Sequence, residues 1–558
     1  MKEYDVCVIG SGAGGGPVAL ELSRAGHDVL VLEKGPWFTE DDFYKDELAC
    51  CRRSVYTPNL KDEQHVIEDY DGQNPDGSYK FKGEPTSDSG WDFWNGNCVG
   101  GSSNFMSGFF YRMKPEDFRL LSEFGPIKGA NVVDWPISYD ELEPYYTKVE
   151  SEVGVSGSVM SHPFAEPRST KDFPYSPTSE HPVTKLIDKT CQQMKLHSLR
   201  TPRAILSKPE GQRRGCEYSG FCGSYGCSSG AKGSARAALL DKAVATGKCK
   251  IIAHAKVNRL ISDQKGKVVA AEFVDQQNKQ QRVSAKIFVV ACQAIETSRL
   301  LLLSSGAKHK DGLANGYGQV GRNLLFSAGG SGYGELAYEK FGDELKQRGP
   351  FVNRGLQDWY VINDKKLGRV KGGTIDFLLR HPNAIGRADS QKWDENDKLV
   401  WGSALKQKLK QEFTHSQSLR FEVFNDWLPT DDCFVSLDDK VKDKWQVPVA
   451  KVRVGYHDHD VVIGKYLVEK SKAVLQQMGA DNISGSASGS PPPNLMAGGC
   501  RFGHDPKTSV LDKDCRAHGV DNLFVTDGSF MPTGGSVPYT WTIYANAFRV
   551  ASIIIKDL

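Results

Sequence analysis

A glycine-rich turn followed by a carboxylate is the pattern best suited to chemistry near the start of the chain. An apolar run leads into GSGAGG (10–15), an apolar-periodic helix follows, and a second apolar run ends in Glu33. Gly10 permits the tight turn, Gly12 lets the backbone approach a pyrophosphate, and Gly15 lets the helix pack close to the strand. Free N–H groups at the helix N-terminus favour an anion, and Glu33 can accept both hydroxyls of a ribose. This order of strand, helix, strand and acid predicts a dinucleotide site.

A second stretch with a suitable carboxylate lies near the C-terminus. In VDNLFVTDGS (520–529) a hydrophobic strand ends in Asp527 and Gly528. The pair can supply a carboxylate and a close backbone approach for a second part of a long cofactor. Taken alone, the same residues also fit a buried strand and its turn.

Three cysteines, Cys216, Cys222 and Cys227, lie in a glycine-rich stretch with the spacing C-x5-C-x4-C. Thiolates at such short spacing can converge on iron or zinc. The other interpretation is a glycine-rich loop that covers the cofactor, with or without one disulfide. The sequence shows no obvious fourth ligand.

Size and composition restrict the class of protein. The 558 residues exceed the roughly 250–300 at which one core stops growing, so more than one domain is expected. The net charge of +1 gives no electrostatic reason to expect binding to nucleic acid or an anionic membrane, and no apolar run is long enough to span a bilayer. Thirteen cysteines fit reduced thiols, and the first strand begins almost at once with no signal peptide before it. We therefore expect a cytoplasmic protein.

The chain changes character along its length. From Cys249 it is rich in strands, and residues 330–450 alternate short aromatic runs with polar turns, which indicates an antiparallel sheet. Residues 460–480 form an amphipathic pattern that Gly479 closes, which predicts a helix.

The order of these blocks resembles the glucose-methanol-choline (GMC) family of FAD-dependent oxidoreductases over the whole chain. The motifs that carry the resemblance are the N-terminal glycine run, NCVGGSS (97–103), AKVNRLI (255–261), VACQAIETSRLLL (290–302) and CRFGHDPKTSVLD with CRAHGVDNLFVTDGSFMPT (500–533).

The resemblance implies an α/β fold: a doubly wound, Rossmann-like FAD-binding domain and a substrate domain whose antiparallel sheet forms a roof over the flavin. Both domains are assembled from separate segments. We expect the FAD-binding domain in 1–130, 201–330 and 485–558, and the substrate domain in 131–200 and 331–484.

The resemblance also assigns cofactor contacts. The ADP half of FAD would be held by Gly10, Gly12, Gly15 and Glu33, and the adenine would meet the backbone of Val257. Gly100, Gly101 and Ser102 would lie beside the flavin ring and pyrophosphate, and Asp527 with Gly528 would meet the ribityl chain. Some relatives attach FAD covalently through a histidine where this chain has Phe105, so we expect non-covalent FAD.

The family's usual catalytic pair is missing from the sequence. Leu495 stands where a histidine base is expected, and Pro538 stands where an asparagine or histidine is expected. Neither side chain can take a proton or bind a forming alkoxide. Another group could serve as base, with Tyr539, Asn494 and His381 as candidates. Alternatively, the flavin oxidises a substrate that needs no base, or the chain binds FAD without turnover as an electron-relay subunit.

The resemblance implies dehydrogenation of a hydroxyl of a sugar, glycoside or other alcohol, with hydride transfer to flavin N5. Some sugar dehydrogenases of the family carry an iron–sulfur cluster on a similar three-cysteine run and pass electrons to a cytochrome. The resemblance therefore predicts a small polyhydroxylated substrate and an electron-accepting partner subunit or cytochrome. If that partner carried an export signal, the protein would instead be periplasmic.

Two tracts of the expected roof suit a polyhydroxylated ligand, because aromatic rings can stack on a sugar and polar groups can bind its hydroxyls. The side chains concerned are Arg354, Gln357, Asp358, Trp359, Arg380 and His381. Ordinary strand alternation explains the same pattern.

Overall fold

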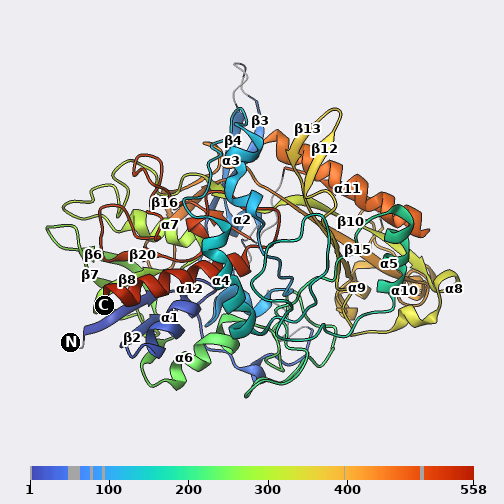
Figure 1. Cartoon of the computed structure of the whole chain (residues 1–558), viewed down its shortest axis with the longest axis horizontal. Coiled ribbons are helices and arrows are strands. Elements are labelled where there is room, and N and C mark those ends of the chain that lie inside the picture. The colour runs from blue at the N-terminus through green and yellow to red at the C-terminus, as the bar shows by residue number, and fades with distance from the viewer. Residues whose placement is uncertain are drawn as a thin grey trace.

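The computed structural model describes residues 3–47, 63–73, 75, 79–90, 93, 95–394, 396–489 and 495–558. Two β-sheets dominate it, one towards each end of the longest axis (Figure 1). Both chain termini lie at the end that contains the larger sheet. Among the described residues, no helix combines the length and the apolar character that crossing a membrane requires.

The larger sheet brings together strands from distant parts of the chain. Its order is β5-β2-β1-β8-β7-β6, and β20 also pairs with β8. Strands β5, β2, β1, β8 and β20 run parallel, while β7 and β6 continue the sheet as antiparallel strands. The strands are β1 (Glu3–Ile9), β2 (Val29–Leu32), β5 (Cys249–Ile252), β6 (Lys256–Ser262), β7 (Val268–Val274), β8 (Gln280–Val290) and β20 (Leu523–Val525).

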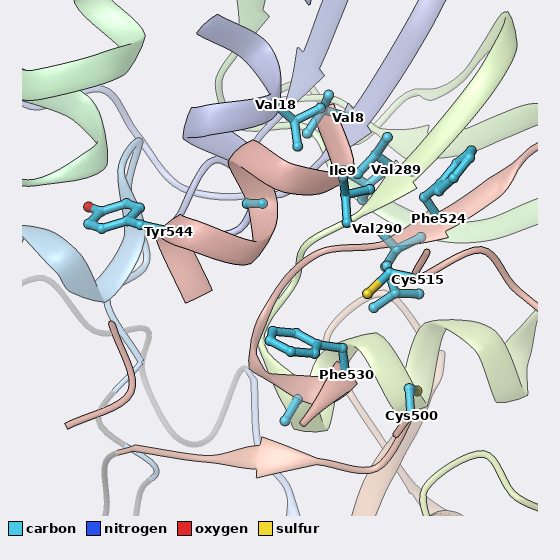
Figure 2. Packing of buried hydrophobic residues seen from close by; sticks show 14 of the residues in the cluster. Val8, Ile9, Val18, Val289, Val290, Cys500, Cys515, Phe524, Phe530 and Tyr544 are labelled. Carbon is cyan, nitrogen blue, oxygen red and sulfur yellow. The ribbon is translucent and has the colours of Figure 1, made fainter. Parts of the chain in front are cut away.

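Apolar residues hold this sheet between helices. Val6, Val8, Val289 and Phe524 are fully buried, as nearly continuous apolar runs require in a sheet covered on both faces. Figure 2 shows Val8 of β1 beside Val18 of α1, and Tyr544 of α12 belongs to the same buried cluster. The surrounding helices are α1 (Gly15–Arg24), α4 (Tyr139–Val149), α6 (Asp241–Ala245), α7 (Ala294–Leu303) and α12 (Thr540–Asp557).

The second sheet is the antiparallel roof, with the strand order β11-β14-β15-β10-β18. One face of it packs on α11 (Asp458–Met478), which Gly479 ends in the left-handed conformation, and on α5 (Val183–Met194). The strands are β10 (Ala328–Ala337), β11 (Arg354–Leu356), β14 (Gly373–Leu379), β15 (Ser416–Asn425) and β18 (Asp481–Ala487). The expected α/β fold with an antiparallel roof is confirmed.

Smaller elements connect the two sheets. A four-stranded sheet, in the order β16-β17-β3-β4, pairs segments far apart in the sequence. The remaining strands and regular helices are β3 (Val66–Gln73), β4 (Tyr79–Pro85), β9 (Leu324–Leu325), β12 (Val361–Asp364), β13 (Gly368–Lys371), β16 (Phe434–Lys442), β17 (Pro448–Arg453), β19 (Ala497–Gly498), α2 (Thr86–Ser89), α3 (Leu120–Phe124), α8 (Tyr338–Phe341), α9 (Ala384–Ser390) and α10 (Gly402–Thr414).

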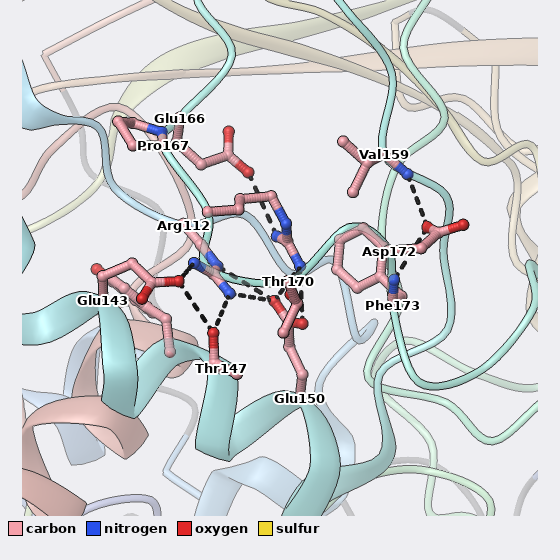
Figure 3. A network of polar contacts seen from close by, with 12 residues as sticks. Arg112, Glu143, Thr147, Glu150, Val159, Glu166, Pro167, Thr170, Asp172 and Phe173 are labelled. Carbon is pink, nitrogen blue, oxygen red and sulfur yellow. Dashed lines mark hydrogen bonds and ion pairs between the residues drawn. The ribbon is translucent and has the colours of Figure 1, made fainter.

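A buried ionic network ties α4 to the loops around it (Figure 3). The side chain of Arg112 has no solvent exposure and lies 2.8 Å from Glu143 and 2.6 Å from Glu150. Arg168 reaches the same Glu150 at 2.7 Å. The paired carboxylates raise the pKa of Arg112 although burial opposes this, so the guanidinium stays charged inside the protein.

We expect Arg112→Met to lower the free energy of unfolding by about 3–5 kcal/mol, because it leaves two buried carboxylates short of a partner. Arg24 provides the matched control, since it pairs with Glu152 at 2.6 Å but its side chain is 40% exposed. Arg24→Met should cost at most about 1 kcal/mol. Denaturant unfolding compares the two variants, and equal losses would contradict the role assigned to the network.

Candidate active site

The carboxyl ends of four parallel strands meet in one row. Ile9 pairs in register with Leu32 and Val290, and Val290 pairs with Val525. The residues that follow these strands line a cavity of about 290 Å³. Ligands of open α/β sheets bind at such an edge. Sequence positions 10, 33, 291 and 526 are thereby brought to one place.

Eight of the ten predicted cofactor residues line this cavity: Gly10, Gly12, Glu33, Gly101, Ser102, Val257, Asp527 and Gly528. Gly15 and Gly100 do not, and each has another place in the site. A Cβ on Gly15 would lie 2.1 Å from the carbonyl oxygen of Gly10, so the start of α1 can approach the turn only with glycine there.

Ser11 joins the two glycine turns. Its backbone N–H and its hydroxyl donate to Glu33 Oε2 at 3.1 and 2.5 Å, and its hydroxyl accepts from the N–H of Gly100 at 3.0 Å. The N–H of Gly35 donates to the other oxygen of Glu33 at 2.9 Å. Burial nevertheless raises the pKa of Glu33, against these hydrogen bonds. Ser11 therefore ties the first turn both to Glu33 and to the second turn, and the sequence did not indicate these contacts.

Several features of the cavity fit a long polar cofactor. A Cβ on Gly12 would meet no protein atom within 4 Å, so the space beside this backbone is open. Asn97 Oδ1 and Gln293 Nε2 are buried without a hydrogen-bond partner, and both residues line the cavity. Unpartnered buried polar atoms are costly, so a ligand that pairs with them would stabilise the site. The residues present therefore fit FAD.

A charged cluster lines another part of the cavity. Glu296 lies 2.8 Å from His65, 3.2 Å from Arg299 and 3.6 Å from Lys256. Burial alone would raise the pKa of Glu296, but Arg299, Lys256 and His65 together hold it well below its usual value. No sequence motif indicated this cluster, because only Glu296 and Arg299 are close along the chain, while His65 and Lys256 come from other segments.

Besides Leu495 and Tyr539, the cavity is lined by the apolar side chains of Phe93, Met106, Met496 and Ile543. The hydroxyl of Tyr539 donates to the carbonyl oxygen of Phe326 at 2.6 Å. Burial raises the pKa of Tyr539 well above its usual value, and Asp426 and Asp460 add to this. A tyrosine in this state is not suited to take a proton at neutral pH.

The other two predicted catalytic residues are not at this place. Asn494 lies outside the described residues. His381 does not line the cavity, and its ring packs edge-on against Tyr225 at 5.7 Å.

The polar side chains expected to form the sugar-binding roof take partners elsewhere. Arg354 pairs with Glu180 and Asp188, Gln357 donates to Thr374, Asp358 pairs with His197, and Arg380 pairs with Glu412. The open face of the roof instead carries Ser331, Tyr333, Arg420, Glu422 and Phe424, all at least partly exposed. Their strand neighbours, such as Phe421 and Val423, point to the opposite face and into the core with α11.

Two carboxylates oppose each other on this open face. Asp376 of β14 is the register partner of Glu422 of β15. Asp376 Oδ1 accepts from the hydroxyl of Tyr111 at 2.6 Å, and its Oδ2 is buried without a partner. Burial raises the pKa of Asp376 to about 7, and Glu422 adds to the rise. Burial likewise raises the pKa of Glu422, against Arg420. Like charges directly opposite destabilise a sheet, so this pair needs a functional explanation.

The structure does not support the predicted metal site. Cys216, Cys222 and Cys227 do line one small cavity. However, among the residues that the structure describes, no group of three or more His, Cys, Asp or Glu is placed to hold a metal ion. Each sulfur has its own partner instead: Cys216 accepts from the N–H of Tyr218, Cys222 donates to Ser107 O, and Cys227 contacts the hydroxyl of Ser229.

Comparisons with known proteins agree with this geometry. Two family models described as GMC oxidoreductase match residues 178–327 and 429–547. The chain is 30% identical to the 2-methyl-1,2-propanediol dehydrogenase of Mycolicibacterium austroafricanum, over 99% of this chain and 95% of the relative. It is 28% identical to the fructose dehydrogenase large subunit of Gluconobacter japonicus, over 99% of this chain and 98% of the relative. A formate oxidase of Aspergillus oryzae RIB40, which carries FAD, has the same fold at a TM-score of 0.65 and 14% identity, covering 100% of this chain and 98% of that one.

We expect Gly12→Ala to lower the affinity for FAD tenfold or more without destabilising the apoprotein. The added methyl group meets no protein atom, but it occupies the space that the pyrophosphate needs. Fluorescence titration of the apoprotein with FAD measures the affinity, and thermal unfolding measures stability. Gly316→Ala is the control, because its Cβ also meets nothing within 4 Å but the residue lies away from the cavity. Equal FAD affinity in both variants would disprove the assignment.

Proposed function

Because the chain belongs to the GMC oxidoreductase family, it is an FAD-dependent oxidoreductase that acts on CH–OH groups, and we propose that its substrate is a sugar, a glycoside or another polyhydroxylated alcohol. The open face of the roof supports this substrate class. Tyr333 offers a ring for stacking, and Ser331, Arg420 and Glu422 offer partners for several hydroxyls.

The cavity lining supports the following assignment of the cofactor contacts. The turn at Gly10 and Gly12 and the start of α1 would bind the pyrophosphate, Glu33 would meet the ribose, and Asp527 with Gly528 would meet the ribityl chain. Phe105 offers no nitrogen for a covalent bond, which supports non-covalent binding. Bound FAD supplies the acceptor for the hydride that leaves the substrate carbon.

The reaction also needs an acceptor for the proton of the substrate hydroxyl. Oxidation of an alcohol to a carbonyl releases a hydride from carbon and a proton from oxygen. Tyr539 lines the same cavity as Leu495, and its hydrogen bond and raised pKa do not suit a base.

We propose that Glu422 accepts the hydroxyl proton and that its register partner Asp376 assists. Glu422 is partly exposed on the open face of the roof, and its raised pKa lies closer to neutrality than that of an ordinary glutamate. Tyr111, which binds Asp376, belongs to the segment that begins with Ser102, Ser103 and Met106 in the cofactor cavity. Neither Glu422 nor Asp376 lines the cavity itself, so the proposal rests on this link through Tyr111 and on the two carboxylates opposed across β14 and β15.

Four further assignments remain proposals. Segments 1–130, 201–330 and 485–558 form the FAD-binding domain, and 131–200 and 331–484 form the substrate domain. A fructose dehydrogenase named as a large subunit among the relatives supports an electron-accepting partner subunit or cytochrome. The eleven described cysteines are all free, which supports a reducing, cytoplasmic location. A partner that carries an export signal would favour the periplasm instead.

Glu422→Gln should lower kcat at least about a hundredfold, the usual effect of removing a general base, and leave the flavin spectrum unchanged. Stopped-flow reduction of the flavin by substrate measures the chemical step. Glu335→Gln is the control, since Glu335 lies further along the neighbouring strand β10 and accepts from Ser416. Unchanged turnover in Glu422→Gln, and also in Tyr539→Phe, would favour oxidation without a base.

The pH dependence of kcat/KM should reveal the carboxylate pair. A base must be ionised to act, so activity should rise as the pH increases through about 7, near the raised pKa of Asp376. Asp376→Asn removes the group whose pKa burial and Glu422 raise to about 7, so this limb should move to lower pH, where Glu422 titrates alone. If the variant's limb stays at the same pH as that of the wild type, Asp376 takes no part in the reaction.

A further inference from the structure

A buried lysine connects the edge of the roof to a segment beside the cofactor cavity. Lys371 is the last residue of β13, shortly before β14 of the roof begins, and its side chain is only 6% exposed. Its ammonium group donates to the hydroxyl of Ser536 at 2.6 Å, and this hydroxyl donates in turn to the carbonyl oxygen of Gly372 at 2.8 Å. Ser536 is thereby held by two neighbouring residues at the start of the roof strand.

Ser536 belongs to a segment that forms part of the cavity. Residues 533–540 lead into α12, and Tyr539 near their end lines the cofactor cavity. We call residues 533–540 the wall segment. Its first residue, Thr533, accepts from the indole N–H of Trp135 at 2.7 Å. The bonds of Ser536 hold the segment at its middle, between this contact and the cavity.

The wall segment has little room to move. A Cβ on Gly534 would lie 2.3 Å from the hydroxyl oxygen of Tyr539, so the two residues are already in close contact. Gly535 has a φ of 66°, a left-handed conformation that favours glycine. In so closely packed a turn, a displacement of Ser536 is passed on to Tyr539 in the cavity.

Acidic groups hold the Lys371 ammonium in place. Asp117, whose side chain has no solvent exposure, lies 2.8 Å from it, and Asp426 lies 3.7 Å from it. The ammonium group also lies 3.9 Å from the ring centre of Tyr360, and the hydroxyl of Tyr360 donates to Asp117 at 2.5 Å. Burial raises the pKa of Asp426, against the effect of Lys371. These contacts fix the direction in which the ammonium group can donate.

Stability alone does not account for this arrangement. A buried ion pair is often no more stabilising than well-packed apolar residues of the same volume, so charges kept in the interior call for another explanation. The hydrogen bond from Lys371 to Ser536 supplies one, because it reaches the segment that meets the cofactor.

We propose that Lys371 is a positioning residue for the flavin reaction: acting through Ser536, it fixes the wall segment against the bound FAD. Lys371 does not line the cavity, so it acts only through this segment. The inference rests on the FAD site and not on Glu422 as the proton acceptor.

Two substitutions test the two ends of the hydrogen bond. Lys371→Met removes the ammonium group and keeps most of the side-chain volume. We expect the rate of flavin reduction by the alcohol substrate to fall at least tenfold, since a displacement of about 1 Å can cost about a hundredfold. The visible circular dichroism of the bound flavin, which needs no substrate, should change as well. Ser536→Ala should change both signals in the same direction, and the double variant should be no slower than Lys371→Met, because both substitutions remove one bond.

Lys114→Met is the matched control. The side chain of Lys114 is 2% exposed, pairs with Glu166 at 3.3 Å and lies 4.9 Å from the ring centre of Tyr360. It is therefore a second buried lysine on the same tyrosine, and its ammonium group donates to Phe164 and Glu166 and not to the wall segment. Lys114→Met should lower the temperature of thermal unfolding, as Lys371→Met does, but keep the wild-type flavin dichroism and rate of reduction.

Wild-type dichroism and reduction in folded Lys371→Met would overturn the proposal. Equal changes in Lys114→Met would also overturn it, because they would show a general effect of lost stability. If Lys371→Met does not fold, Ser536→Ala decides, and a wild-type flavin signal in that variant contradicts the proposal. If no polyhydroxylated alcohol reduces the wild-type flavin, the proposed substrate class fails, while the dichroism still tests Lys371.

Discussion

The alignment of four strand ends is the constraint on which the rest of the structure depends. Ile9, Leu32, Val290 and Val525 share one register, so the segments after them emerge at the same edge of the sheet. A shift by one residue in any strand would turn its side chains to the opposite face and move a cofactor residue out of the cavity. The close approach of Gly15 to Gly10 and the bonds of Ser11 to Glu33 and Gly100 then hold the turns in place.

Burial determines the chemistry that this site can perform. It raises the pKa of Tyr539 and so removes the nearest hydroxyl from use as a base. On the roof it raises the pKa of Asp376 to about 7 and brings that acid into the range where a proton can be exchanged at neutral pH. Burial therefore argues against Tyr539 as the proton acceptor and for the pair formed by Asp376 and Glu422. Under the proposed assignment, a chain without the family's usual pair still has a group that can take the hydroxyl proton.

Local sequence was sufficient to predict the elements whose residues lie close together along the chain. The glycine turn, Glu33, the strand ending at Asp527 and the helix closed by Gly479 follow from conformational freedom and periodicity, and the structure has them all. The positions of Asn494 and of the predicted domain boundaries remain untested predictions. The roles of Arg354 and Gln357 could not be read from alternation, because both side chains turn to partners brought in from other segments.

What only the tertiary structure decided are the contacts between residues far apart in sequence. Asp376 and Glu422 are opposed because β14 and β15 pair in one register, and Glu296 meets His65 and Lys256 because three segments converge. The three cysteines, close in sequence, take separate partners because the surrounding backbone offers each sulfur its own group. The sequence by itself determined the cofactor and the family, since short motifs encode them. The environment of each titratable group depends on long-range packing, and only the fold determines it.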